Sequence, residues 1–374
     1  MDFSISEEQQ SIQELAKQIL GDRCTDDYQN EFDRLPEDFD EALWKQLAEK
    51  DLLGTALPEE AGGMGMGIAE LCGLLEEQGR VLAHVPLSSV LVQAALPIAE
   101  FGSDAQRKAL LPGIITGSHW VTAALQETLG DPSAPATRAS ANGDGFTLDG
   151  RKIGVNVAEG AVRIVVSARH EDGSTGLFLV DPAGPGVNLD RVTSTTRRAA
   201  YQVSLDAAPA ELLGGERAGE ALDWTLLRAR VALATVTLGV AEEALRRTAD
   251  YVSNRKQFGK PIGTFQGVAL RSADAYIDLE CMRTTLWQAI DKLDRGQEAA
   301  KEVAVAKWWA CRAGQRVVHT AQHLHGGIGV DVEYPIHRFF LWAKSLEIEL
   351  GGASQHRRDL GHRLATESRS HDTA

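Results

Sequence analysis

Apolar side chains recur at the spacing of one helix face in two long stretches of the chain, residues 221–254 and 268–293. This periodicity predicts two long helices. The connection between them, residues 255–266, contains two glycines and a proline, which a continuous helix does not tolerate. We therefore expect an ordered turn between antiparallel helices. The side chains that we expect this turn to present together are Arg255, Phe258 and Gln266.

The beginning of the chain also has a helical pattern. Ser6 is followed by two glutamates and a glutamine, which is typical of a helix N-cap and first turn, and predicts a helix that reaches Leu20. Further helices are predicted over 36–51 and 68–80. The glycine-rich run 61–67 superficially resembles a phosphate-binding loop, but no strand precedes it and no lysine follows it. We therefore interpret this run as a turn.

Between about residues 120 and 213 the pattern changes to short β-rich runs. The sequence Asn-Gly-Asp-Gly at 142–145 lies between two such runs and predicts a hairpin. A small antiparallel β domain follows from these signals. Beyond Glu216 the chain is predicted to be helical again to about His362, and its polar tail to be disordered. Other short strands are predicted over 162–167, 176–180 and 201–205.

Length, composition and charge limit the number of domains, the class of protein and the kind of partner. The chain has 374 residues, of which 43% are hydrophobic and 24% charged. This length allows two or three packed domains, and the composition is that of an ordinary globular protein. The formal net charge of -15 comes without a basic stripe, which argues against nucleic acid as a partner.

The sequence favours a cytoplasmic location. The acidic start of the chain does not have the basic and apolar regions of a signal peptide. No window approaches eighteen uninterrupted apolar residues, so we expect no membrane span. The cysteines are scattered and form no C-x-x-C pair, so we expect buried, reduced thiols and no metal site. They are Cys24, Cys72, Cys281 and Cys311.

The turn at 255–266 has the residue types of a clamp for an anionic, planar ligand. A guanidinium binds phosphate, an aromatic ring stacks, and an amide reads the edge of a heterocycle. From the residues alone, a structural role is the main alternative: Arg255 would cap a helix and Phe258 would pack in the core.

Three motifs together resemble those of the acyl-CoA dehydrogenases. The first is R-K-Q-F-G-K-P-I-x-x-F-Q at 255–266, and the second is H-G-G-I-G-V-D-V-E-Y-P at 325–335. They are separated by about sixty residues with helical patterning. The third, P-E-E-A-G-G at 58–63, resembles the amino-terminal turn of that family, and the resemblance is weakest in the middle third.

The resemblance implies the fold of this family, an α+β architecture in three domains. Residues 1–118 would form an N-terminal helical domain and residues 119–215 a middle antiparallel β-barrel-like domain. Residues 216–374 would form a C-terminal four-helix bundle, with the tail at about 363–374 disordered.

The chemistry that the resemblance implies requires FAD and a carboxylate. In the family a glutamate removes the α-proton of an acyl-CoA thioester while the β-hydrogen leaves as hydride to the flavin. The segment that matches the family's is Gly352–Gln355, and the residue in the glutamate position is Gly351. An alternative family position, on the preceding long helix, is occupied by Ala229. We therefore predict no catalytic residue in this chain. Glu347 and Glu349 are interpreted as polar helix positions.

The segments that seat the flavin ring in the family are also altered. The family's T-E-P-x-A-G-S-D loop corresponds only loosely to residues 126–132. Where the family has W-I-T, this chain has Gly-Val-Asn at 154–156. An indole replaced by hydrogen removes a stacking platform worth about 3 kcal/mol, by analogy with large-to-small substitutions.

The elements that a family subunit donates to its neighbour's FAD are mostly kept. Among them His323 stands where glutamine is usual, and it still offers a hydrogen bond. Arg338 keeps a basic position of the family, whereas Leu341-Trp342 replaces an Arg-Asp pair. The resemblance therefore implies that this chain donates FAD contacts without receiving them. The predicted cofactor-binding residues are Arg255, Phe258, Gln266, His323, Gly326 and Gly327.

A donor subunit of this kind suits a heteromer. The resemblance is to the glutamate-free partner subunits of actinobacterial steroid side-chain acyl-CoA dehydrogenases. It implies an α2β2 tetramer with a homologous catalytic subunit, a bulky acyl-CoA substrate, and electron-transfer flavoprotein as the acceptor. Two alternatives stay open. One is a homo-oligomeric flavoprotein of the same fold with other chemistry, such as flavin monooxygenation, and the other is a non-catalytic acyl-CoA-binding scaffold.

Overall fold

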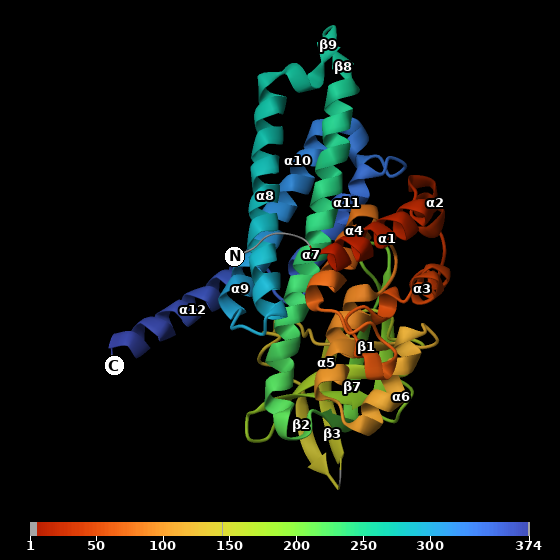
Figure 1. The fold of residues 1–374 in the computed structure, drawn as a ribbon, viewed down its shortest axis with the longest axis vertical. Helices are drawn as coiled ribbons and strands as arrows, with labels where there is room; N and C mark the ends of the chain where they lie inside the picture. The colour runs from red at the N-terminus through yellow and green to blue at the C-terminus, as the bar shows by residue number, and fades with distance from the viewer. Residues whose placement is uncertain (1–5, 144, 373–374) are drawn as a thin grey trace. The chain divides into compact units, whose positions relative to one another are not determined.

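A computed structural model describes residues 6–143 and 145–372 of the chain. Helices dominate its first and last parts, and strands its middle (Figure 1). The described residues form two compact units. One comprises those of Met1–Leu35, Cys72–Ala83 and Leu233–Ala374, and the other comprises Pro36–Leu71 and His84–Ala232.

The α-helices are α1 Glu7–Arg23, α2 Asp26–Phe32, α3 Glu41–Ala48, α4 Ile68–Val81, α5 Leu96–Phe101, α6 Asp104–Ile115, α7 Ala218–Asn254, α8 Gln266–Asp294, α9 Ala300–Trp309, α10 Gln315–His325, α11 Ile336–Ile348 and α12 Ala353–Asp372. Two π-helical segments, η3 Ser88–Ala95 and η6 Ala310–Gly314, run directly into α5 and α10. The strands are β1 Val121–Ala124, β2 Arg138–Asn142, β3 Gly145–Val155, β4 Arg163–His170, β5 Thr175–Val180, β6 Val187–Thr193, β7 Ala199–Leu213, β8 Lys256–Gln257 and β9 Lys260–Pro261.

The start of α1 confirms the predicted capping residues. The N–H of Gln9 donates to the Ser6 hydroxyl, and the Gln9 side chain accepts from the N–H of Ser6, both at 3.0 Å. This reciprocal pair is a capping box, which satisfies two otherwise free donors. The prediction for 36–51 was wrong at its start, because α3 begins only at Glu41. Asp40 caps that helix by accepting the N–H of Leu43 at 3.0 Å, so the residues before it stay outside.

The glycine-rich run is a packed turn, as predicted. The N–H of Gly63 donates to the carbonyl of Pro58 at 3.0 Å, and that of Gly65 donates to the carbonyl of Leu57 at 2.8 Å. A Cβ on Gly63 would lie 2.2 Å from the oxygen of Leu57. Glycine is needed there because the chain folds back onto itself, and the amides are used within the turn.

The strands form a closed sheet. Neighbours follow the order β1-β4-β2-β3-β7-β5, and an additional β4–β5 pairing closes the ring, while β6 pairs with β7. Most pairs are antiparallel, and the predicted hairpin is present as β2 and β3, with Asn142 opposite Gly145. Two parallel pairings, β1 with β4 and β2 with β4, were not predicted. Leu148, Ile164 and Phe178 are fully buried inside this barrel.

The C-terminal helices pack as a bundle. The predicted long helices are present as α7 and α8, and they run antiparallel on either side of the β8–β9 hairpin (Figure 1). Helix α8 packs against α9 and α10, and α10 packs against α11. Glu242 of α7 binds Arg283 of α8 at 2.9 Å and Arg80 of α4 at 3.0 Å, so one carboxylate links three helices.

The apolar character of α7 has to be compared with the prediction that the chain has no membrane span. Within the described residues, Gly215–Asn254 is long and apolar enough to cross a membrane by length and composition alone. Of its apolar window, 83% is buried within the protein. Such burial is typical of a core helix, whose apolar character serves packing.

The predicted disorder of the tail was wrong for 363–372, because α12 continues to Asp372. The segment contains no proline, and its two arginines, its leucine, its alanine and its glutamate favour helix even where few apolar residues are present. Residues 373–374 of the predicted tail lie outside the described residues.

Helices α4 and α7 cross with their backbones in contact. A Cβ on Gly79 would lie 2.1 Å from the carbonyl oxygen of Val236, and one on Gly239 would lie 2.0 Å from that of Glu76. Neither glycine has room for a side chain, because the backbone of the other helix occupies that space.

We expect Gly239→Ala to lower the free energy of unfolding by about 2 kcal/mol, because the added methyl group must push two helix backbones apart. Gly267→Ala is the matched control, since a Cβ there meets nothing within 4 Å. In a helix that control should leave stability unchanged or raise it. Urea unfolding of both variants measures the difference, and equal stability of the two would contradict the close crossing.

Candidate functional site

The turn after α7 is a tight β-hairpin. The N–H of Arg255 donates to the carbonyl of Tyr251 at 2.8 Å and ends the helix. The carbonyl of Arg255 accepts the N–H of Ile262, also at 2.8 Å, and closes the hairpin. Strands β8 and β9 pair Gln257 with Lys260, which leaves two residues at the tip. The main chain of Arg255 is thus held at the base of the hairpin while its side chain stays exposed.

Phe258 lies at the tip in an unfavourable conformation. Its φ is 52° and that of Gly259 is 81°, so both tip residues are left-handed, as a two-residue hairpin of this type requires. Glycine adopts this conformation without strain, whereas a bulky side chain does not. Phe258 is 93% exposed, and its ring lies edge-on to that of Phe265, at a centroid distance of 6.3 Å. The structural alternative of a core phenylalanine is therefore wrong.

The second predicted element lies at the end of α10. Gly326 ends the helix with φ 65° and ψ -140°, a combination that in practice only glycine adopts. Gly326 and Gly327 are exposed, and a Cβ on either would meet nothing within 4 Å. The exposed backbone therefore leaves room for another molecule to approach closely. His323, in the last turn of α10, is exposed as well.

Two aromatic rings join these two elements. Tyr251 of α7 stacks on His325 of α10, with a centroid distance of 4.3 Å and an interplanar angle of 21°, and its hydroxyl donates to the carbonyl of His325 at 3.4 Å. Burial lowers the pKa of His325, so its ring is neutral near pH 7. The contact holds the end of α7 beside His325, the residue that precedes Gly326. The sequence analysis missed this pair.

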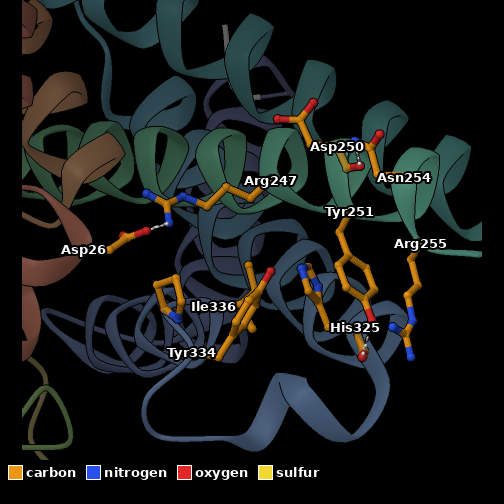
Figure 2. Close-up of a pocket in the computed structure, with 10 residues that line it drawn as sticks. Asp26, Arg247, Asp250, Tyr251, Asn254, Arg255, His325, Tyr334 and Ile336 are labelled. Atoms are coloured by element: carbon orange, nitrogen blue, oxygen red, sulfur yellow. Dashed lines mark hydrogen bonds and ion pairs between the residues drawn. The ribbon is translucent and has the colours of Figure 1, made fainter.

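A cavity of about 580 Å³ lies beside the stacked rings. Figure 2 shows Arg255 extending from the end of α7 past Tyr251. Of the predicted site residues, Arg255 lines this cavity, and the other five do not. The structure thus places Arg255 beside the end of α10 and Phe258 at the exposed tip. The lining residues are Asp26, Arg247, Asp250, Tyr251, Asn254, Arg255, His325, Tyr334, Pro335 and Ile336.

The basic residues near the cavity have different roles. Arg247 binds both carboxylate oxygens of Asp26, at 2.8 and 2.9 Å, so its charge is used within the protein. Arg338 is 5% exposed and binds Asp33 at 3.0 Å, so this family position holds α2 in place. Within the described residues, the guanidinium of Arg255 has no ion pair. It is therefore free to bind an external anion.

At Gly351 the backbone itself argues against a carboxylate. Its φ is 106°, outside the range that L side chains favour. A Cβ there would lie 2.9 Å from Oε1 of Gln355 and 3.1 Å from Nε2 of His356. The ring of His356 already donates to the carbonyl of Gly351 at 2.9 Å. A glutamate at this position would thus meet both backbone strain and crowding.

The structure places the other candidate positions as follows. Ala229 is fully buried in α7 and has no titratable group. Glu347 is bound by Lys344 at 2.8 Å, one helical turn before it. Glu349, at the end of α11, is half-buried. Lys344 and Glu347 form the local ion pair expected on the surface of a helix.

In the β domain, two residues in or next to the segment that would seat a flavin ring have a left-handed backbone. Gly154 has φ 67°, a conformation that disfavours a tryptophan. Val157 also has a positive φ, and its carbonyl accepts the indole N–H of Trp120 at 2.9 Å. The carbonyl of Asn156 accepts the hydroxyl of Thr122 at 2.6 Å. These main-chain groups are used within the protein.

The neighbouring loop is held by a buried ion pair that the sequence analysis missed. Lys152 is fully buried, and its ammonium donates to Glu127 at 2.7 Å and to the hydroxyl of Ser167 at 2.9 Å. Glu127 also accepts the N–H of Ala136 and both the N–H and the hydroxyl of Thr137. Burial opposes ionisation of Glu127, but the Lys152 charge and these hydrogen bonds prevail and lower its pKa to about 2. Burial lowers the pKa of Lys152 to about 8, so the pair is ionised at pH 7.

Two family models match this sequence. The acyl-CoA dehydrogenase N-terminal domain matches residues 6–118, and the acyl-CoA dehydrogenase C-terminal domain matches residues 219–365. The chain therefore belongs to the acyl-CoA dehydrogenase family, whose members are oxidoreductases. Its helical, β and helical regions are the fold of that family, as the resemblance implied.

Three relatives place the chain further within the family. It is 35% identical to acyl-CoA dehydrogenase FadE27 of Mycobacterium tuberculosis, over 98% of this chain and 99% of that one. A chain of a variant of the Tcur3481-Tcur3483 steroid ACAD is 49% identical, with a TM-score of 0.93 over 97% of this chain and 99% of that one. A chain of the ChsE4-ChsE5 complex from Mycobacterium tuberculosis is 35% identical, with a TM-score of 0.92 over 98% and 99%.

We expect Gly351→Ala to lower the free energy of unfolding by about 2 kcal/mol, because alanine at positive φ is strained and its methyl group crowds His356. Gly352→Ala is the matched control, since the nearest atom to a Cβ there is 4.0 Å away. Chemical unfolding compares the two. A Gly351→Ala variant as stable as the control would show that this position accepts a side chain.

We expect Glu127→Gln to lower stability at pH 7 by about 3 kcal/mol, because it leaves Lys152 buried without a countercharge. The pKa of Glu127 lies below its unfolded value of about 4.3, so its contribution is present above that pH and is lost as the pH falls toward 2. Stability of the wild type should therefore fall more steeply than that of the variant over this range. Glu60→Gln, at an exposed position, is the matched control and should keep the wild-type dependence of stability on pH. Thermal unfolding at a series of pH values measures the stability of all three proteins.

Proposed function

We propose that this chain is the donor subunit of a heteromeric, FAD-dependent acyl-CoA dehydrogenase. In this proposal it holds the nucleotide end of FAD with Arg255, Phe258, Gln266, His323, Gly326 and Gly327, while a homologous subunit supplies the base and the ring seat. When bound, FAD accepts the hydride that leaves the acyl group. The observation that carries the proposal is Phe258, an aromatic side chain held fully exposed in a strained turn.

The residues present fit the nucleotide end of FAD. Arg255 offers a guanidinium without a partner among the described residues, and such groups bind phosphate through two parallel hydrogen bonds. The backbone at Gly326 and Gly327 is open, so a ligand can approach it closely. Strained residues cluster at ligand contacts, because the bound state repays the strain.

Little in this chain supports the half of the site that would seat the flavin ring and carry the catalytic glutamate. Gly351 disfavours the family glutamate, and Gly154 disfavours the family tryptophan, each through its positive φ. The chain's own residues would therefore orient FAD and exclude water from its nucleotide end. Removal of the α-proton belongs to the partner subunit in this proposal.

Exposed apolar residues on α8 support association with another subunit. Leu270, Tyr276 and Ile277 are 58%, 58% and 59% exposed. Tyr276 and Ile277 line a shallow cavity of about 460 Å³ together with Trp309. Apolar side chains grouped in this way are typical of surfaces that a partner covers.

The assembly and the substrate are proposed from the relatives. The ChsE4-ChsE5 structure is that of a complex, and Tcur3481-Tcur3483 is a steroid ACAD. We extend both properties to this chain, as an α2β2 tetramer acting on a steroid side-chain or other bulky acyl-CoA. Electron-transfer flavoprotein is the proposed acceptor, which rests on the family alone.

Flavin content tests the proposal directly. The chain purified alone should be colourless, and its complex with a homologue that carries the glutamate should contain about one FAD per heterodimer. One FAD per subunit in the isolated chain would instead establish a homomeric flavoprotein. A complex without flavin would establish a scaffold. Oxidation of only short, straight-chain acyl-CoAs would overturn the substrate assignment and leave the donor role intact.

We expect Phe258→Gly to raise the stability of the isolated chain by about 1 kcal/mol, because glycine relieves the left-handed strain. The same change should weaken FAD binding by the complex, by about tenfold for the loss of one stacking contact. Gln257→Gly is the matched control in the same hairpin and should gain no stability and keep its FAD. Thermal unfolding and flavin release measure the two effects. A stabilised Phe258→Gly variant with unchanged FAD affinity would remove Phe258 from the site.

A further inference from the structure

Three neighbouring strands of the β domain align charged residues in one row. Arg138 of β2 is the Cα partner of Arg169 in β4 and of Asp149 in β3. Directly opposite residues of paired strands point to the same face, with their side chains close together. The two arginines therefore lie side by side, where β2 begins and β4 ends.

Both side chains of this pair of arginines are exposed, and neither makes an ion pair with any residue that the structure describes. Asp149 uses one carboxylate oxygen to accept the N–H of Ala207 at 3.0 Å. Like charges directly opposite each other destabilise a sheet. The chain of net charge -15 thus keeps two neighbouring arginines outside any ion pair within the described residues, although the carboxylates of Asp149 and Glu171 lie in the same cavity.

The pair opens onto a cavity of about 500 Å³. This volume lies within the range of small-molecule sites, roughly 300–1,000 Å³. His170 also lines the cavity. Its ring makes an edge contact with Phe146, at a centroid distance of 5.4 Å, and a tilted contact with Phe178, at a centroid distance of 5.3 Å. The remaining lining residues are Ala139, Ser140, Glu171 and Gly173.

We propose that this cavity binds the phosphoryl group of a small molecule between Arg138 and Arg169. Two guanidinium groups side by side offer parallel donors that match phosphate oxygens, and the bound anion removes their mutual repulsion. The carboxylates of Asp149 and Glu171, which also line the cavity, oppose the anion and limit its affinity. None of these residues belongs to the donor set or to the segments of the ring seat, so the site is independent of the proposed flavin role.

Calorimetric titration of the complete chain with sodium pyrophosphate tests the site, at constant ionic strength set with sodium chloride. Saturable binding is expected in the wild type, and a loss of at least tenfold in affinity in Arg138→Gln and in Arg169→Gln. Arg151→Gln is the matched control, because Arg151 is an exposed arginine of β3 outside the cavity. Asp149→Asn should bind more tightly than the wild type, since it removes the opposing charge and keeps an acceptor for Ala207.

Three results would overturn the proposal. They are the absence of saturable binding in the wild type, an equal loss in Arg151→Gln, and unchanged affinity in both cavity variants. Thermal unfolding without ligand confirms that the variants are folded. Titration with ADP then identifies the source of the phosphoryl group: equal affinity for ADP and pyrophosphate assigns the site to the phosphoryl group alone, and tighter binding of ADP assigns it to a nucleotide. Flavin content is not a readout here, so failure of this site leaves the donor role untouched.

Discussion

The proposed role of this chain depends on the left-handed turn between α7 and α8. Two long helices that run antiparallel must reverse direction, and here they do so through a two-residue hairpin of the type in which both tip residues have positive φ. Gly259 meets this requirement without strain, whereas Phe258 meets it at a cost. The turn thereby exposes the aromatic ring of Phe258 on the protein surface, three residues after Arg255. A sequence selected for stability alone would favour glycine at both positions, so the strained Phe258 supports the proposed contact of its ring with a molecule beyond the chain.

Local signals in the sequence were sufficient for much of the fold. The capping box at Ser6, the hairpin at 142–145 and the two long helices depend on residues close in sequence, and the structure confirms them. The parallel pairing of β1 with β4 depends on residues about forty positions apart, for which no local signal exists. The late start of α3 was visible in principle, because Asp40 followed by helix formers is a capping signal.

The candidate site shows the same division. Arg255, Phe258 and the two glycines were found through motifs, and their exposure agrees with a binding role that stays a proposal. The stacking of Tyr251 on His325 was missed, because it joins residues of two helices far apart in the chain. Arg138 and Arg169 were missed for the same reason, since only the register of β2 and β4 makes them neighbours.

The backbone at Gly351 has an evolutionary consequence. After a gene duplication, a subunit that has lost one catalytic side chain can regain it by a single amino-acid change as long as its backbone still accommodates that side chain. A left-handed glycine hydrogen-bonded to His356 no longer does so. Under the proposed division of labour, restoring activity to this copy would require coordinated changes in the loop and in its neighbours. Selection would therefore act on the two genes as a pair, and their dependence on each other would become permanent.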